Sequence, residues 1–232
     1  MKNISVKKYE NRESLINDLN DEIIQSLNNG VSENNKASML LSGGTTPGPL
    51  YEKLSKETLD WDKVWFAPTD ERWVAPDHDD SNEKLIRNML LQNNASSANY
   101  VGLKSSPDNP RDGQPKTENK LATFPAPIDV VLIGMGTDGH MASLFPGVHD
   151  TIVAMDEGNA NRCAPIVRGN GEVDRISMTL NCILNSKQVI LFFYGDEKLK
   201  VFEKASLGKT DELPVSYLLN QDKVPVTLYW AE

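Results

Sequence analysis

The 232-residue sequence has few of the residues that build disulfide-linked or membrane-spanning proteins. It has only two cysteines, Cys163 and Cys182, which form neither a CxxC motif nor a zinc-ligand spacing, so we expect two reduced thiols. No apolar run approaches the roughly 20 residues that cross a bilayer. The first residues also lack the apolar stretch of a signal peptide. These absences predict a soluble, cytoplasmic protein without a membrane partner.

Positive charge is scarce as well. The sequence has 24 Lys and Arg against 33 Asp and Glu, a formal net charge of −9, which argues against a general nucleic-acid binder. An anionic ligand therefore needs a local cluster of positive groups. Hydrophobic residues make up 39% of the chain and charged residues 25%, as in an ordinary globular protein with a sizeable core.

Apolar patterns divide the chain into alternating strands and helices. Apolar residues recur every four positions within residues 13–29, which predicts an amphipathic helix. Short apolar runs predict strands at 4–9, 37–41, 64–67, 128–133, 151–154, 164–167, 175–180, 189–194 and 226–230. This alternation predicts an α/β fold, with one Rossmann-like domain over residues 1–232 and helices on both faces of a largely parallel sheet.

Further helices are expected at 47–54, from about residue 80, at 196–205 and at 214–219. Asp80 is expected to cap the second of these helices together with Glu83, and Asp196 to cap the third. Residues 104–120 are polar and rich in Pro, Asp, Asn and Lys. They predict a long surface loop or a poorly formed helix start.

The strongest functional signal begins with the apolar run Val130–Ile133, which suits a strand buried on both faces. Three glycines follow within six residues, Gly134, Gly136 and Gly139, and they allow close approach to the main chain. The turn ends on His140. An imidazole thus lies at the carboxyl end of a central strand, where ligands bind in open α/β sheets. A tight turn with a surface histidine is the structural alternative.

A second signal follows the strand 37–41. The loop Ser-Gly-Gly-Thr-Thr at residues 42–46 leads into a helix that begins near Pro47. Backbone N–H groups, hydroxyls and the helix dipole in such a loop favour an anion. The loop is neither a Walker A nor a GxGxxG motif, and an ordinary tight turn is the alternative.

Charged residues follow two other predicted strands. The run 70–72, Asp-Glu-Arg, follows the strand 64–67 and forms either a solvated loop or a site. Lys198 falls in the first turn of the helix 196–205, where a cation opposes the helix dipole. That position is explained by a nearby anion, or by a surface lysine that pairs with Asp196 or Glu197.

Three segments taken together resemble a known family. They are Leu-Ser-Gly-Gly-Thr-Thr-Pro at 41–47, Thr-Asp-Glu-Arg-Trp-Val at 69–74 with the following Ser-Asn, and Gly-Met-Gly-Thr-Asp-Gly-His-Met-Ala-Ser-Leu-Phe-Pro at 134–146. The sequence resembles the 6-phosphogluconolactonases of the family related to glucosamine-6-phosphate deaminase. Residues 175–180 and 195–198 fit as well, so the resemblance runs from about residue 10 to the C-terminus.

The resemblance implies a Rossmann-like sheet and hydrolysis of 6-phospho-D-glucono-1,5-lactone to 6-phosphogluconate, the second step of the oxidative pentose phosphate pathway. It implies no metal and no cofactor. By the same resemblance, His140 is the catalytic histidine and Arg72 stabilises charge. The implied ligands of the substrate phosphate are Ser42, Gly43, Gly44, Thr45, Arg175 and Lys198.

The residues themselves fit this chemistry. Water opens a δ-lactone through a tetrahedral oxyanion, and histidine is the natural base near pH 7. Asp138 lies two residues before His140 and is expected to orient it or to restrain a water, whereas Asp70 would hold Arg72 or a substrate hydroxyl. The oxyanion donors are Arg72, backbone N–H groups of the glycine turn, or both. No cysteine or serine has a sequence-evident base beside it, which favours direct attack by water.

Two alternatives remain. A glucosamine-6-phosphate deaminase or isomerase would share the fold, but such enzymes carry a glutamate where this sequence has Phe145, and a phenyl ring cannot relay a proton. A non-catalytic sugar-phosphate-binding protein is the other, although regulators of this kind carry a DNA-binding module for which this acidic chain has no room. We expect a small-molecule partner, the sugar-phosphate lactone, and a monomer or small homo-oligomer.

Overall fold

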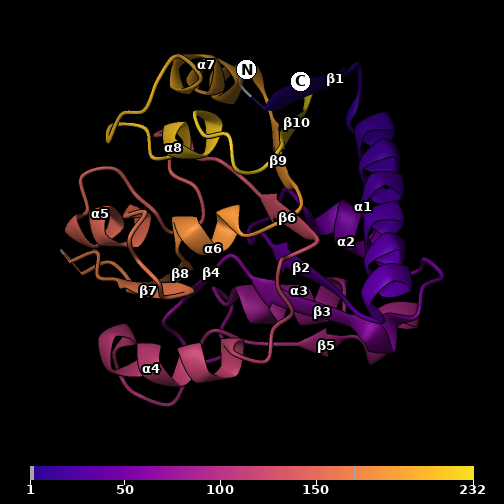
Figure 1. Ribbon diagram of the computed structural model, residues 1–232, viewed down its shortest axis with the longest axis horizontal. Coiled ribbons are helices and arrows are strands. Elements are labelled where there is room, and N and C mark those ends of the chain that lie inside the picture. The colour runs from indigo at the N-terminus through magenta and orange to yellow at the C-terminus, as the bar shows by residue number, and fades with distance from the viewer. Residues whose placement is uncertain (1–2, 170) are drawn as a thin grey trace.

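The computed structural model describes residues 3–169 and 171–232 (Figure 1). Within them, seven parallel strands form the main sheet, in the order β1 (Ile4–Tyr9), β10 (Val226–Ala231), β9 (Val189–Tyr194), β6 (Val130–Ile133), β2 (Ala37–Leu41), β3 (Val64–Pro68) and β5 (Asn99–Tyr100). A smaller antiparallel sheet has the order β4 (Asp70–Arg72), β8 (Arg175–Met178) and β7 (Cys163–Ile166). The predicted α/β class with a largely parallel sheet is confirmed.

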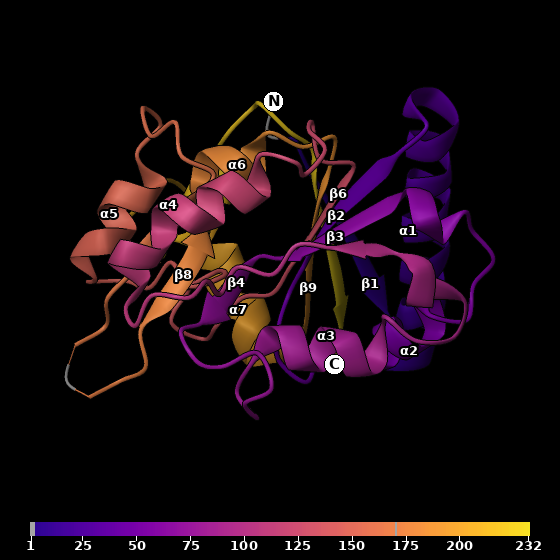
Figure 2. The same cartoon turned by 90° about the horizontal axis from the view of Figure 1, so that it is seen from below.

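Helices cover both faces of the main sheet (Figures 1 and 2). One face carries α1 (Arg12–Asn34), α2 (Gly48–Leu54) and α3 (Asn82–Met89). The other carries the small sheet, α4 (Pro110–Leu121), α5 (His149–Met155), α6 (Leu180–Leu184), α7 (Asp196–Ala205) and α8 (Val215–Leu219). Two short 3₁₀ helices, η1 (Trp61–Lys63) and η2 (Asn93–Ser97), lie in the connections. In the part of the chain that is described, no helix has the length and apolar character needed to cross a membrane.

The apolar run of β6 contributes to two separate cores. Val130 and Leu132 pack into the core beneath α1, α2 and α3, whereas Val131 and Ile133 pack into the core on the opposite face. Successive side chains of a strand point to opposite faces, so a strand covered on both sides must be apolar throughout. This central position places the glycine turn that follows β6 in the middle of the sheet edge.

The structure decides one open prediction and contradicts another. Of the two expectations for residues 104–120, a loop or a helix start, the structure shows the helix α4 over most of the stretch, because Asn109 caps the helix through the N–H of Asp112 and Pro110 occupies its first turn. The buried Thr117 also donates to the carbonyl of Leu103. The strand predicted at 151–154 lies in the helix α5. Four apolar residues do not distinguish the two states, and here burial at positions 151 and 154 follows the helical period.

Two predicted helix caps also differ. The cap of α3 is Ser81, whose hydroxyl accepts from the N–H of Lys84, and not Asp80. The residue before α7 is Gly195, with φ 88°, so Asp196 is the first helical residue and makes no cap hydrogen bond with its side chain. Both predictions misplace the helix start by one residue.

The two cysteines lie in the described part of the chain and are free thiols, as predicted. Cys163 is fully buried in β7. Burial raises the pKa of Cys163, and it raises the pKa of Cys182 to about 12. Both groups are therefore protonated at neutral pH.

Thr69 joins the main sheet to the small one. It lies between the end of β3 and the start of β4. Its N–H donates to the carbonyl of Leu41 in β2, and its carbonyl accepts from the N–H of Met178 in β8, each at 2.8 Å. The strand β4 consequently begins at the carboxyl edge of the main sheet, and it brings Asp70 and Arg72 to the place where β2 and β6 end.

Candidate active site

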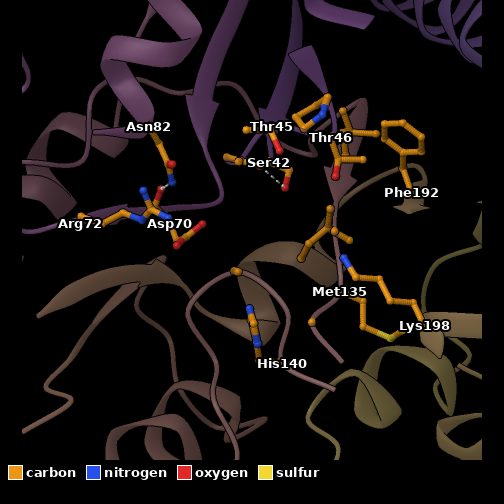
Figure 3. Close-up of a pocket in the computed structure, with 18 residues that line it drawn as sticks. Ser42, Thr45, Thr46, Asp70, Arg72, Asn82, Met135, His140, Phe192 and Lys198 are labelled. Atoms are coloured by element: carbon orange, nitrogen blue, oxygen red, sulfur yellow. Dashed lines mark hydrogen bonds between the residues drawn. The ribbon is translucent and has the colours of Figure 1, made fainter. Parts of the chain in front are cut away.

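A cavity of about 320 Å³ lies at the carboxyl ends of β2, β3, β6 and β9 (Figure 3). Its volume lies within the range of small-ligand sites, and its position is the one at which open α/β sheets bind ligands. The sequence-predicted residues that line it are Ser42, Gly43, Gly44, Thr45, Asp70, Arg72, His140 and Lys198. Two other predicted residues, Asp138 and Arg175, do not line it.

Residues 42–47 form one wall of the cavity, between β2 and α2. The Tyr51 hydroxyl, from α2, donates to the carbonyl of Ser42 at 2.6 Å. Burial raises the pKa of Tyr51 well above its ordinary value, so this hydroxyl keeps its proton. The hydroxyl-bearing residues Thr45 and Thr46 line the same wall. The bond from Tyr51 thus holds the first residue of the loop in place, and the loop presents hydroxyls and main-chain groups to a ligand.

His140 and Asp138 form a close pair in the turn after β6. The imidazole Nδ1 lies 2.5 Å from Asp138 Oδ1, which also accepts from the backbone N–H of His140 at 3.1 Å. A carboxylate only accepts hydrogen bonds, so Nδ1 carries a proton and Nε2 keeps its lone pair when the ring is neutral. Partial burial alone would raise the pKa of Asp138, but its hydrogen bonds and charge interaction with His140 outweigh this and lower it.

Gly136 lets this turn close around the histidine. A Cβ at Gly136 would lie 2.2 Å from His140 Nδ1 and 2.5 Å from Asp138 Oδ1, so no side chain fits there. The Gly136 N–H donates to the carbonyl of His140 at 2.9 Å. Phe145 packs against the imidazole, with ring centroids 4.6 Å apart. The ring is thus held between a main-chain turn and an aromatic side chain.

The strand β4 supplies Asp70 and Arg72 to another wall (Figure 3). Asp70 Oδ2 accepts from the Ser143 hydroxyl at 2.6 Å, and the Arg72 guanidinium donates to the carbonyl of Asp80. Over residues 3–169 and 171–232, no hydrogen bond or ion pair joins Asp70 to Arg72. Of the two roles predicted for Asp70, contact with a substrate hydroxyl therefore stays a prediction, and among the described residues no hydrogen bond or ion pair to Arg72 supports the other role.

The two predicted phosphate cations lie in different places. Lys198 lines the cavity, and within the described residues its amino group pairs with no side chain, including those of Asp196 and Glu197. Arg175 lies opposite Arg72 in the β4–β8 register and lines an adjoining hollow that shares Arg72 with the cavity. Burial, followed by the charge of Arg72, lowers the pKa of Arg175. The structure therefore brings Lys198 into the site and leaves Arg175 beside it.

Sequence reasoning did not identify several other lining residues as part of the site. Asn82 lies at the start of α3, and only the Ser-Asn pair that follows the Asp-Glu-Arg motif in the family resemblance pointed to it. Met135 lies within the glycine turn and Ala142 lies two residues after His140, so the turn was the available signal for both. Phe192 lies inside the buried strand β9, and nothing in its sequence context marked it.

Comparisons with known proteins identify the family of this chain. A family model described as glucosamine-6-phosphate isomerases/6-phosphogluconolactonase matches residues 10–230, nearly the whole chain. The protein belongs to this family. The predicted family membership is thereby confirmed.

Relatives in this family share most of their length with the chain. The 6-phosphogluconolactonase of Pseudomonas putida is 33% identical over 229 residues, which cover 98% of this chain and 93% of the relative. A crystal structure of a 6-phosphogluconolactonase from Shewanella baltica is 35% identical, covers 99% of this chain and 98% of that one, and superposes with a TM-score of 0.94. A monomeric glucosamine-6-phosphate deaminase is 17% identical with a TM-score of 0.78, over 98% of this chain and 97% of that one, a likeness of fold alone.

Proposed function

We propose that the protein is a 6-phosphogluconolactonase, which hydrolyses 6-phospho-D-glucono-1,5-lactone to 6-phospho-D-gluconate in the oxidative pentose phosphate pathway. The observation that carries the proposal is His140, which pairs with Asp138 at 2.5 Å and lines a cavity that the glycine loop and Lys198 also line. The family membership and the names of the full-length relatives support it. Hydrolysis of a phosphorylated lactone requires a general base and an anion-binding site in the same cavity.

In the proposed reaction, His140 Nε2 takes a proton from a water molecule while the water oxygen bonds to the lactone carbonyl carbon. The carbonyl oxygen becomes an oxyanion, which Arg72 stabilises. Asp138 stabilises the imidazolium through Nδ1. The tetrahedral intermediate then breaks the bond to the ring oxygen, and the imidazolium returns its proton to that oxygen as the leaving hydroxyl.

The phosphate of the substrate is assigned to the other side of the cavity. In Figure 3, Lys198 extends towards Thr46 and Ser42, and Arg72 lies across the cavity from it. The loop residues Ser42, Gly43, Gly44 and Thr45 then surround the phosphate, and Lys198 supplies its counter-charge. Arg175 remains a predicted partner, but its side chain must turn from the adjoining hollow into the cavity to reach the ligand.

Phe145 argues against deamination as the second candidate. Its ring packs on His140 and has no ionisable group, so the position that would hold a catalytic glutamate cannot transfer a proton. A protein that binds sugar phosphates without catalysis would show affinity for 6-phosphogluconate and no turnover.

A turnover assay on freshly prepared lactone tests the proposal, with the spontaneous rate of hydrolysis subtracted. The wild-type protein is expected to hydrolyse the lactone, and His140→Ala is expected to lose about 10²- to 10⁴-fold in kcat with little change in KM. Thermal melting of the variant checks that it is folded. A wild-type rate equal to the spontaneous rate would reject the proposal, and ammonia release from glucosamine 6-phosphate would favour the deaminase instead.

A further inference from the structure

Glu71 is a buried carboxylate that the proposed chemistry does not use. Its side chain is 1% exposed, and in the described part of the chain no cation pairs with it. Its Oε1 accepts from the N–H groups of Arg72 and Asn82, both at 2.8 Å. Its Oε2 accepts from the N–H of Glu83 at 2.7 Å and from the hydroxyl of Ser81 at 3.1 Å. Four donors therefore converge on one carboxylate.

Three of these donors belong to the first turn of α3 or to its cap. The initial N–H groups of a helix have no acceptor within the helix, and Glu71 accepts from two of them. Burial raises the pKa of Glu71, and the backbone N–H groups that point at the carboxylate act in the opposite direction. The start of α3 is consequently fixed to β4, the strand that carries Asp70 and Arg72.

This attachment places the side chain of Asn82 between two walls of the cavity. Its Nδ2 donates to the carbonyl of Asp70 at 2.8 Å (Figure 3). A Cβ at Gly43 would lie 2.1 Å from Asn82 Oδ1, so the loop 42–47 rests directly against the same amide. Asn82 lines the cavity and is 2% exposed. The distance between the loop 42–47 and β4 therefore depends on the position of the Asn82 side chain.

We propose that Glu71 is a positioning residue that acts through Asn82. It sets the spacing between the loop 42–47, which is assigned to the phosphate, and the reacting end of the cavity, where His140 and Arg72 lie. The proposal rests on the proposed function. A carboxylate is needed because all four of its neighbours donate. In Glu71→Gln, the amide nitrogen would face two donors in place of an acceptor, which leaves buried donors unpaired and displaces the start of α3.

The spacing matters only to a substrate that uses both ends of the cavity. For 6-phospho-D-glucono-1,5-lactone, we expect Glu71→Gln to lower kcat/KM by about 10- to 100-fold, because a small misplacement of a bound substrate is costly. Unphosphorylated glucono-1,5-lactone uses only the reacting end and should lose much less. A general loss of structure would lower both rates equally, so the ratio of the two rates separates positioning from folding.

The test compares Glu71→Gln with Glu83→Gln on both lactones. Glu83 is a matched control, because it is the buried neighbouring carboxylate of α3, and its side chain pairs with Arg87 and does not line the cavity. Glu83→Gln is expected to leave the ratio of the two rates unchanged. Asn82→Ala is expected to reproduce the selective loss, and the double variant with Glu71→Gln should lose no more than the stronger single variant.

In the kinetic comparison, two outcomes would overturn the proposal: equal losses on both lactones, or additive losses in the double variant. If Glu71→Gln does not melt cooperatively, the test uses Asn82→Ala alone. This variant keeps the backbone N–H of residue 82, which donates to Glu71. If the wild-type protein hydrolyses neither lactone, the proposed function fails. Calorimetry with 6-phosphogluconate, whose phosphate and carboxylate lie at opposite ends of the molecule, then tests the positioning alone, with weaker binding expected in Asn82→Ala than in Glu83→Gln, and equal binding rejecting it.

Discussion

The Ser143 hydroxyl donates to Asp70 Oδ2 across 2.6 Å, although 73 positions separate the two residues in the sequence. Ser143 lies three residues after His140 in the turn that follows β6, and Asp70 begins β4. The Ser143 N–H also donates to the hydroxyl of Ser177, which is the register partner of Asp70 in β8. One buried hydroxyl thus fixes the histidine turn to the strand that carries Arg72.

We expect Ser143→Ala to weaken both folding and turnover, because the buried Asp70 carboxylate loses a donor. An unpaired buried acceptor costs about 1–3 kcal/mol, which urea unfolding would measure as a loss of free energy of unfolding. The kcat should fall by about 10-fold if Asp70 contacts the substrate. An unchanged kcat in a destabilised Ser143→Ala protein would limit the bond to a structural role.

Asp138→Asn should lose a stabilising interaction that depends on pH. The folded-state pKa of Asp138 lies below its ordinary value, so the carboxylate stabilises the fold above that ordinary value, and this contribution disappears as pH falls through the folded-state pKa. The melting temperature of Asp138→Asn should therefore lie below that of wild type at pH 6, and the difference should shrink as pH falls below the ordinary pKa of an aspartate. A melting-temperature difference that stays constant from pH 3 to pH 6 would contradict this.

The same Asp138→Asn variant should have a lower kcat, by about 10²- to 10⁴-fold, because an amide permits the wrong imidazole tautomer. Its KM for the lactone should change little, since Asp138 does not line the cavity. Steady-state kinetics of a folded Asp138→Asn protein check this. A normal kcat would show that Nδ1 needs no carboxylate.

Lys198→Ala should raise KM for the phosphorylated lactone by roughly 10- to 150-fold, because a charge-assisted contact contributes about 1.5–3 kcal/mol. Unphosphorylated glucono-1,5-lactone should be affected far less. Lys200→Ala is the control, because Lys200 is an exposed lysine of the same helix outside the cavity. Equal losses on both substrates in Lys198→Ala would show that Lys198 does not bind the phosphate.

Arg72→Ala should lose about 10²- to 10³-fold in kcat and little in KM, the pattern of an interaction made mainly with the oxyanion. Arg72→Lys should recover only part of this, since a point charge cannot reproduce the planar fork. Calorimetry should show that both variants bind 6-phosphogluconate almost as well as wild type. If Arg72→Ala loses product binding but keeps its kcat at saturating lactone, Arg72 binds the phosphate and the proposed roles are reversed.

The sequence alone determined the features whose causes are local. The run 130–133 predicted a strand covered on both faces, because burial requires apolar side chains at every position of such a strand. The contact of Asp138 with His140 could also be predicted from the sequence, because only one residue separates the two in a glycine turn. The location of the site followed from the rule that parallel strands end at one edge, so their loops meet there.

The tertiary structure decided the features that depend on crossings between distant segments. Thr69 directs β4 away from the main sheet through bonds to Leu41 and Met178, and no local pattern encodes that direction. The contacts of Asp70 with Ser143 and of Glu71 with the start of α3 follow from this crossing. The position of Arg175 beside the cavity, opposite Arg72, has the same origin, because strand register is set by pairing across the sheet and not by the order of residues along the chain.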